Sequence, residues 1–223
     1  MDKKLFIKAI FRFFLGVLMV GFLLFVPAGS FDYWKAWLFM GLLFIPMFIA
    51  GIVMMIKNPK LLERRLNLKE REKDQKEVIA YSGLMFLLGF IMAGINYRFC
   101  WFEISNTFVI IASTLFIISY VLYAEVLREN EYLLRTIEVE KDQKLVDTGL
   151  YGIVRHPMYA TTLILFLTMP LILGSLVSFI IFLAYPLIIA KRIKNEEEVL
   201  EKELKGYKEY MKKVKYKMIP FIW

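Results

Sequence analysis

Six long apolar stretches, separated by short polar segments, make up most of the chain. They lie at about residues 9–27, 36–56, 78–97, 104–127, 157–173 and 175–190. Each is close to the roughly 17–25 residues that a helix needs to cross the hydrocarbon core of a bilayer, and the last two are the shortest. The pattern predicts an all-α integral membrane protein with about six transmembrane helices.

The basic residues alternate between the two ends of these predicted helices. All but two of the 29 Lys and Arg residues lie in the N-terminal 12 residues, between the second and third stretches, between the fourth and fifth, or after the sixth. The two exceptions are Lys35 and Arg98. Because cytoplasmic segments of membrane proteins carry the excess of Lys and Arg, this distribution predicts a multi-pass protein with both termini in the cytoplasm.

The composition agrees with a membrane protein of one domain. Hydrophobic residues make up 59% of the 223 residues, against about 45–50% in soluble domains. The net charge of +8 follows from the topology, so we expect membrane lipid and no nucleic acid as a partner. Within the single domain we expect helical hairpins and an amphipathic loop over 1–135, and a catalytic half over 136–223.

Metal and disulfide chemistry receive no support from the sequence. Cys100 is the only cysteine and His156 the only histidine, so neither an intrachain disulfide nor a cysteine zinc site can form. A carboxylate site for Mg²⁺ stays open, but we predict no metal centre.

The segments between the apolar stretches predict further local structure. Residues 26–34 and 99–103 are expected to turn two hairpins, and 58–66 to form a short amphipathic helix on the membrane surface. After residue 190 the charged tail predicts an emerging helix with a break at Gly206. The apolar ending 219–223 is suited to fold back onto the membrane surface or over a pocket.

Prolines mark three places in the last two apolar stretches. Pro157 is expected in the first turn of its helix, behind His156 near the N-cap, where a missing N–H costs nothing. Pro170 and Pro186 lie inside the predicted helices and are expected to kink them, because each removes a backbone hydrogen bond.

Two polar clusters flank this last pair of apolar stretches. One is 149–159, which contains His156 and Tyr159, and the other is 192–197, which contains Arg192 and Glu196. His156 and Tyr159 are three residues apart, and Arg192 and Glu196 are four apart, so each pair shares a helix face. Antiparallel packing of the two helices would bring both clusters to one membrane face.

Such a pocket suits a ligand that carries a positive centre, an adenine-like ring and a carboxylate. A carboxylate can neutralise the cation, and tyrosine rings offer π faces to a sulfonium or ammonium. Taken singly, the elements also fit ordinary roles. His156 could be an interfacial helix cap, the pair Arg192 and Glu196 a surface ion pair, and Glu196–Glu198 a solvated helix face.

The two clusters carry a resemblance to a known family. Residues 145–151, Arg155–Tyr159, Arg192 with 196–200, and 206–210 resemble the isoprenylcysteine carboxyl methyltransferases of prokaryotic type and the related phospholipid N-methyltransferases. The similarity covers about residues 31–223 and is strongest over 143–223. These families are membrane enzymes that use S-adenosylmethionine without a nucleotide-binding sheet, and this chain contains no GxGxxG motif.

The resemblance implies roles for individual residues. Arg192 would be the catalytic residue and hold the acceptor, and Glu197 would assist in binding the substrate. Whether Glu140 also contacts the cofactor is left open by the sequence. The residues implied to bind S-adenosylmethionine are Gln143, Lys144, Leu145, Val146, Tyr151, His156, Pro157, Met158, Tyr159 and Glu196.

The implied reaction is methyl transfer to a lipophilic acceptor at the membrane interface. Carboxyl O-methylation of an isoprenylcysteine-like substrate is the first expectation. A phospholipid amine or a small thiol is the alternative acceptor. A sterol-type membrane reductase that uses NADPH is an alternative from another class, and a non-enzymatic membrane scaffold is a third. The sequence leaves the oligomeric state open.

Overall fold

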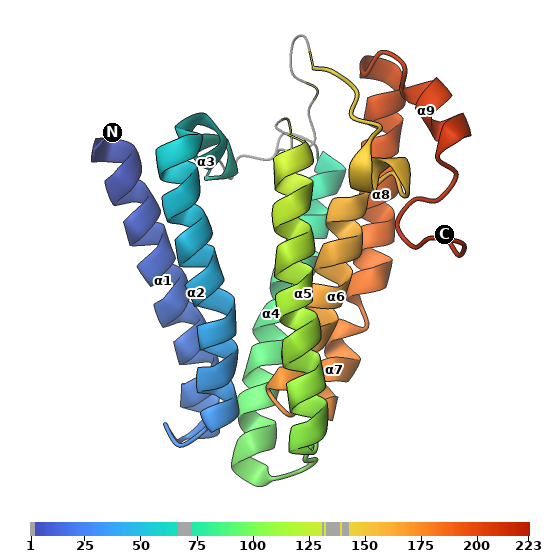
Figure 1. Cartoon of the computed structure of the whole chain (residues 1–223). Coiled ribbons are helices and arrows are strands. Elements are labelled where there is room, and N and C mark those ends of the chain that lie inside the picture. The colour runs from blue at the N-terminus through green and yellow to red at the C-terminus, as the bar shows by residue number, and fades with distance from the viewer. Residues whose placement is uncertain (1–2, 67–72, 131, 133–138, 140–142) are drawn as a thin grey trace.

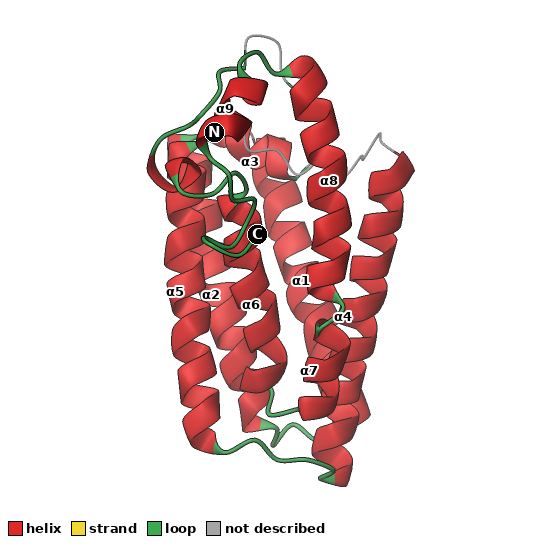
Figure 2. Ribbon diagram, turned by 90° about the vertical axis from the view of Figure 1, so that its right-hand side faces the viewer, coloured by secondary structure: helices red, strands yellow, loops and turns green. Residues whose placement is uncertain are grey.

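The computed structural model describes residues 3–66, 73–130, 132, 139 and 143–223, which form a helical bundle with no strand among them (Figures 1 and 2). Glu140 lies outside the described residues. The helices are α1 Lys3–Ala28, α2 Trp34–Lys57, α3 Pro59–Arg65, α4 Lys73–Phe99, α5 Asn106–Glu129, the 3₁₀ turn η1 Gly149–Gly152, α6 Pro157–Ile172, α7 Leu176–Phe182, α8 Tyr185–Glu203 and α9 Tyr207–Lys213.

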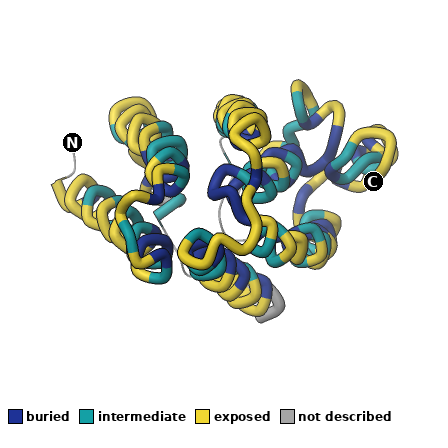
Figure 3. Tube along the Cα trace, turned by 90° about the horizontal axis from the view of Figure 1, so that it is seen from below, coloured by how far each residue is buried: buried dark blue, intermediate teal, exposed yellow. Residues whose placement is uncertain are grey.

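The long helices have the character of membrane spans. Within the described residues, five segments are long and apolar enough to cross a bilayer: α1, α2, 76–99 of α4, α5, and 176–203. Large apolar side chains such as Leu18 and Phe22 are exposed on the outer sides of the helices, while the sides that face the bundle are buried (Figure 3). Such an apolar exterior indicates a multi-pass membrane protein.

The fifth predicted span is shorter than the others. Helix α6 has 16 residues, which corresponds to about 24 Å, against about 30 Å of hydrocarbon core. The predicted span at 157–173 is therefore not among the five segments, and it would reach across the core only together with its flanking residues.

The last predicted span, at 175–190, is not one continuous helix. Helix α7 ends at Phe182, and α8 begins at Tyr185 after a turn at Leu183 and Ala184. Pro186 lies at the start of α8, where its missing N–H is tolerated. Pro186 therefore follows a break in the helix and does not lie inside a kinked helix. Pro170, in contrast, lies inside α6, which continues to Ile172.

Two glycines of α4 allow close helix packing. A Cβ at Gly94 would lie 2.5 Å from the carbonyl oxygen of Leu24, and a Cβ at Gly89 would lie 2.3 Å from the ring of Phe182. Ser178 also donates a 2.8 Å hydrogen bond to the carbonyl oxygen of Gly89. Small residues at such crossings let helix backbones approach in a membrane, so α4 joins α1 to α7.

The helices α4 and α5 are neighbours in sequence, but α5 packs mainly against α6. The second hairpin expected from the sequence is therefore a chain reversal without an extensive helix–helix interface. Helix α6 in turn contacts both α7 and α8. A 2.8 Å hydrogen bond between the hydroxyls of Thr162 and Tyr185 links α6 to the start of α8. This contact sets the register of the two polar clusters.

One end of the bundle gathers the polar parts of the chain. The start of α1, the short helix α3, the turn η1 and helix α9 all lie at this end (Figure 1). The expected amphipathic helix is present as α3, where the Asn58 side chain accepts a 3.1 Å hydrogen bond from the Leu61 N–H and Leu61 and Leu62 are buried. The turns that follow α1, α4 and α6 lie at the opposite end.

Candidate functional site

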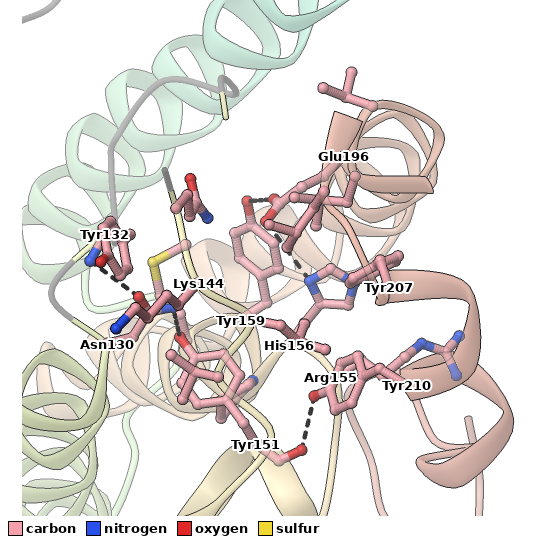
Figure 4. A pocket seen from close by; sticks show the side chains of 18 of the residues that line it. Asn130, Tyr132, Lys144, Tyr151, Arg155, His156, Tyr159, Glu196, Tyr207 and Tyr210 are labelled. Atoms are coloured by element: carbon pink, nitrogen blue, oxygen red, sulfur yellow. Dashed lines mark hydrogen bonds and ion pairs between the residues drawn. The ribbon is translucent and has the colours of Figure 1, made fainter. Parts of the chain in front are cut away.

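A pocket opens at the polar end of the bundle, where segments distant in sequence meet. The end of α5, the segment 143–146, η1, the start of α6, the second half of α8, and α9 with the turn before it all contribute to its wall. Figure 4 shows the side chains that line it. The lining residues are Asn130, Tyr132, Gln143, Lys144, Leu145, Val146, Tyr151, Arg155, His156, Pro157, Met158, Tyr159, Arg192, Glu196, Val199, Leu200, Leu204, Tyr207 and Tyr210.

All ten residues expected at the cofactor and the expected acceptor residue Arg192 lie in this one wall. Glu197 is the exception among the candidate residues, because it does not line the pocket. The antiparallel course of α6 and α8 therefore brings the two polar clusters together, as the sequence predicts.

Tyr159 is the physical link between the clusters. Its hydroxyl donates a hydrogen bond to Glu196 and accepts one of 2.9 Å from Nε of Arg192. The ring of His156 stacks against that of Tyr159, and His156 Nδ1 lies 3.8 Å from a carboxylate oxygen of Glu196 (Figure 4). The start of α6 and the middle of α8 thus form one hydrogen-bonded wall of the pocket.

Glu197 lies behind this wall in a buried ion network. Its Oε1 is 2.8 Å from Nε of Arg155 and 3.2 Å from Nε2 of His156, and its Oε2 is 2.7 Å from Nζ of Lys217. Arg155 and Glu197 are both buried, and a buried charge is tolerated only when it is paired and hydrogen-bonded. The geometry therefore favours a structural role for Glu197 over the expected contact with the acceptor.

The C-terminal segment completes the network. Nη1 of Arg155 donates to the carbonyl oxygens of Val214 and Lys215, at 2.8 and 2.9 Å. The backbone N–H groups of Arg155 and His156 donate to the carbonyls of Tyr216 and Lys217, at 2.9 and 2.8 Å. The tail after α9 therefore docks beside the pocket and holds His156 against α8.

The turn η1 is fixed to the end of α5 by one carboxylate. The backbone N–H of Leu150 lies 3.2 and 3.0 Å from the two carboxylate oxygens of Glu129. Gly149 adopts a left-handed conformation with φ of +56°, and a Cβ there would lie 1.6 Å from Oε1 of Glu129. Only glycine at this position leaves room for the contact with Glu129. The contact fixes η1 and thereby places Tyr151 in the pocket wall.

Two further hydrogen bonds hold Tyr151. The side-chain amide of Asn130 donates to its hydroxyl at 3.0 Å, and the hydroxyl of Tyr210 donates to its carbonyl oxygen at 2.7 Å (Figure 4). Burial raises the pKa of Tyr151 well above that of an exposed tyrosine. Its hydroxyl therefore stays protonated at neutral pH.

Tyr207 is a lining residue whose buried hydroxyl is unsatisfied. The residue is only 3% exposed, and its hydroxyl has no hydrogen-bond partner among the described residues. Burial, followed by the charge of Glu197, raises the pKa of Tyr207 far above its ordinary value. A protonated donor without a protein partner in a pocket wall fits an acceptor atom on a ligand.

Sequence reasoning did not assign a role to Asn130, Tyr207, Tyr210 or Leu204. The signal for Tyr207 was the helix break, which the structure confirms: α8 ends at Glu203 and α9 begins after Gly206, which has φ of +87°. Nothing local marks Asn130, since it reaches the pocket only because α5 packs beside α6.

No group of three or more His, Cys, Asp or Glu residues suited to a metal ion occurs in the described part of the chain. The pocket instead combines carboxylate, guanidinium, aromatic and apolar groups.

Comparison with known proteins shows that a segment containing many of the pocket residues is similar to a known family. The phospholipid methyltransferase family model matches residues 106–206. The match runs from α5 through α8, and it includes the residues Tyr159, Arg192 and Glu196. It supports a membrane methyltransferase.

A second similarity points to another enzyme class. The Delta(14)-sterol reductase TM7SF2 of Mus musculus is 31% identical over 93 residues, which make up 40% of this chain and 22% of the reductase. The similarity therefore spans about a fifth of that relative's length.

Proposed function

We propose that this protein is a methyltransferase that uses S-adenosylmethionine and acts on a lipophilic acceptor at the cytoplasmic side of the membrane. The main support is the hydrogen-bonded chain from Arg192 through Tyr159 to Glu196 in one pocket. This chain lies within the segment that is similar to phospholipid methyltransferases. The residue pattern and the family similarity thus support the same chemistry.

The residues of the pocket fit the proposed cofactor. S-adenosylmethionine carries a sulfonium, and when bound it supplies the methyl group. The carboxylate of Glu196 and the ring faces of Tyr151 and Tyr159 suit a positive centre. The apolar side chains of Leu145 and Leu200 suit an adenine ring, and the hydroxyl of Tyr207 offers a hydrogen bond to an acceptor atom.

Arg192 is assigned to the methyl acceptor. Its guanidinium can grip a carboxylate in a bidentate manner that lysine cannot reproduce. A carboxylate is already ionised at neutral pH and requires no general base, so the residues would act mainly by holding donor and acceptor in line. Tyr159 would position both charged partners, because its hydroxyl bonds to Arg192 and Glu196 at once.

The acceptor most consistent with this site is a carboxylate, as in an isoprenylcysteine-like substrate. A phospholipid amine is the second candidate, and the family match supports it. An amine must lose a proton before it can accept a methyl group. Glu197 is engaged by Arg155 and Lys217 and is a poor base for that step. A small thiol is the third candidate.

A membrane reductase is the alternative from another class, supported by the similarity to a sterol reductase. It would place a nicotinamide cofactor in the same pocket. Because both cofactors contain adenosine, the apolar lining does not discriminate between them, and a binding experiment must.

The deciding experiment is calorimetric titration of the purified full chain with S-adenosylhomocysteine and, separately, with NADPH. We expect S-adenosylhomocysteine to bind and NADPH not to bind. Glu196→Ala should weaken the binding of S-adenosylhomocysteine by about tenfold or more, since it removes a carboxylate that can pair with the α-ammonium, the cation that this ligand keeps after the sulfonium is lost. The exposed neighbour Glu198 provides the control Glu198→Ala, which should bind normally. Binding of NADPH alone would favour the reductase.

The acceptor is identified by transfer of a labelled methyl group. S-farnesylcysteine, phosphatidylethanolamine and a small thiol would be offered separately to the protein in lipid vesicles. We expect label in the carboxyl ester of the prenylated cysteine. Label that appears only in the phospholipid would transfer the assignment to a phospholipid N-methyltransferase.

A further inference from the structure

A second pocket lies at the opposite end of the bundle from the proposed methyl-transfer site. The loop between α1 and α2, the end of α4, the link from α4 to α5, and the turn between α6 and α7 form its wall. Polar residues in this wall include Lys35, Asn96, Arg98 and Glu103, and aromatic residues include Trp34 and Phe102.

The two basic residues at this end of the bundle both line the pocket. Lys35 and Arg98 are the two basic residues that lie outside the basic segments of the chain, and both line this cavity. Nζ of Lys35 donates to the carbonyl of Ile104 at 3.1 Å, and the guanidinium of Arg98 lies over the ring of Phe99. Neither cation forms an ion pair with a carboxylate of the described residues, so their charge is available to an external anion.

Two left-handed glycines lie beside these cations, and the one next to Lys35 leaves room for its side chain. Gly174 has φ of +75°, and a Cβ there would lie 2.8 Å from Cδ of Lys35. Gly29 has φ of +66°, and a Cβ there would lie 3.6 Å from the guanidinium carbon of Arg98. The side chain of Lys35 is therefore packed against a chain turn, which limits the freedom it must lose when it binds an anion, whereas Arg98 is exposed beside Gly29.

Asn96 adds an unused hydrogen-bond acceptor. It is only 4% exposed, and its Nδ2 donates to the carbonyl of Phe102 at 2.9 Å. Its Oδ1 has no partner among the described residues. Buried polar atoms are rarely left unsatisfied, so this oxygen fits a donor supplied by a ligand.

We propose that this pocket binds the head group of a phospholipid from the leaflet at this face. The phosphate contacts Arg98 and Lys35, and an N–H or O–H of the head group donates to Oδ1 of Asn96. The carboxylate of Glu103 favours an ammonium beside the phosphate. Trp34 would lie at the depth of the head groups, where Trp and Tyr side chains are enriched. Choline lacks a donor, so ethanolamine and glycerol head groups are preferred.

The test is native mass spectrometry of the full chain in mild detergent, with phosphatidylethanolamine, phosphatidylglycerol and phosphatidylcholine added in turn. We expect one retained lipid per chain from the first two, and about tenfold weaker retention of phosphatidylcholine. Arg98→Gln should weaken retention of the first two by about tenfold, because it removes a charge-assisted contact. The matched control Arg128→Gln lies at the end of α5 on the other face and should retain lipid normally.

Separate readouts distinguish this proposal from the proposed enzyme. Arg98→Gln should bind S-adenosylhomocysteine like the unaltered protein. Its thermal unfolding should also match that of the unaltered protein, which shows that the variant is folded even if neither protein binds S-adenosylhomocysteine. Equal retention of all three lipids by both variants would mean that lipid binds only non-specifically to the protein surface, and it would overturn the proposal. Displacement of the lipid by millimolar inorganic phosphate would also overturn it, since the site would then bind a free anion.

Discussion

Tyr207 combines two properties that normally exclude each other, deep burial and an unpaired hydroxyl. Leaving a buried donor unsatisfied costs about 1–3 kcal/mol. We therefore expect Tyr207→Phe to raise the free energy of unfolding of the ligand-free protein by about 1 kcal/mol and to weaken S-adenosylhomocysteine binding by about tenfold. Thermal unfolding and calorimetry measure the two effects.

Tyr210→Phe is the matched comparison. Its hydroxyl donates to the buried carbonyl of Tyr151, so its loss should lower the free energy of unfolding by about 1 kcal/mol. If Tyr207→Phe behaved like Tyr210→Phe, or left affinity unchanged, the hydroxyl of Tyr207 would not serve the ligand.

Arg192 tests the assignment of the acceptor. Arg192→Lys keeps the positive charge but loses the planar fork and the hydrogen bond from Nε to Tyr159. We expect kcat for methyl transfer to fall by about a hundredfold, while S-adenosylhomocysteine binding changes little. The exposed pair of Lys191 with Glu77 supplies a control, because Lys191→Gln should leave both quantities near those of the unaltered protein. An unchanged kcat in Arg192→Lys would remove this residue from the reaction.

At the scale of elements, the turn η1 requires glycine at position 149. Gly149→Ala would force a Cβ onto the carboxylate of Glu129 at a left-handed φ. We expect the free energy of unfolding to fall by more than about 1 kcal/mol, and cofactor affinity to fall with it, because η1 carries Tyr151. Gly152→Ala is the control, since its Cβ would meet only the Asp147 carbonyl at 3.4 Å. Equal stability of the two variants would contradict this account of η1.

The break between α7 and α8 is an element boundary that the sequence did not predict. The apolar pattern continues through Leu183 and Ala184, so it predicts one helix over 175–190. Pro186 marks the region, but a proline is tolerated at a helix start as well as inside a kinked helix. The packing of Phe182 against Gly89 of α4 and of Tyr185 against Thr162 of α6 accompanies the boundary between them.

For the whole molecule, the two pockets lie at opposite ends of the bundle, so their orientation across the membrane matters. Cys100 is exposed in the turn that follows α4, at the end of the bundle opposite the start of α1 (Figure 1), and it is the only cysteine. We expect a membrane-impermeant maleimide to label Cys100 in intact cells, because the basic residues predict cytoplasmic termini.

A reversed reporter completes the topology measurement. The variant Cys100→Ser with Lys205→Cys carries its thiol between α8 and α9, at the end of the bundle with the start of α1 (Figure 1). It should be labelled only after the cells are permeabilised. Labelling of Lys205→Cys in intact cells would place the proposed methyl-transfer pocket outside the cytoplasm.

The sequence alone determined the membrane class, the positions of the first five predicted helices and the convergence of two polar clusters. These features are local or periodic: apolar length, the alternation of basic segments, and the spacings of His156 to Tyr159 and of Arg192 to Glu196. Antiparallel packing of the last two apolar stretches then required only a turn between them.

The tertiary structure decided which charged residues face the pocket and which support it from behind. Glu196 and Glu197 are adjacent and chemically alike, yet only the first lines the pocket, since the second is held by Arg155 and Lys217. The unpaired hydroxyl of Tyr207 and the joint cavity of Lys35 and Arg98 likewise depend on chain segments far apart in sequence. Whether a polar atom is satisfied depends on every neighbour that packing brings to it, and a linear pattern does not record those neighbours.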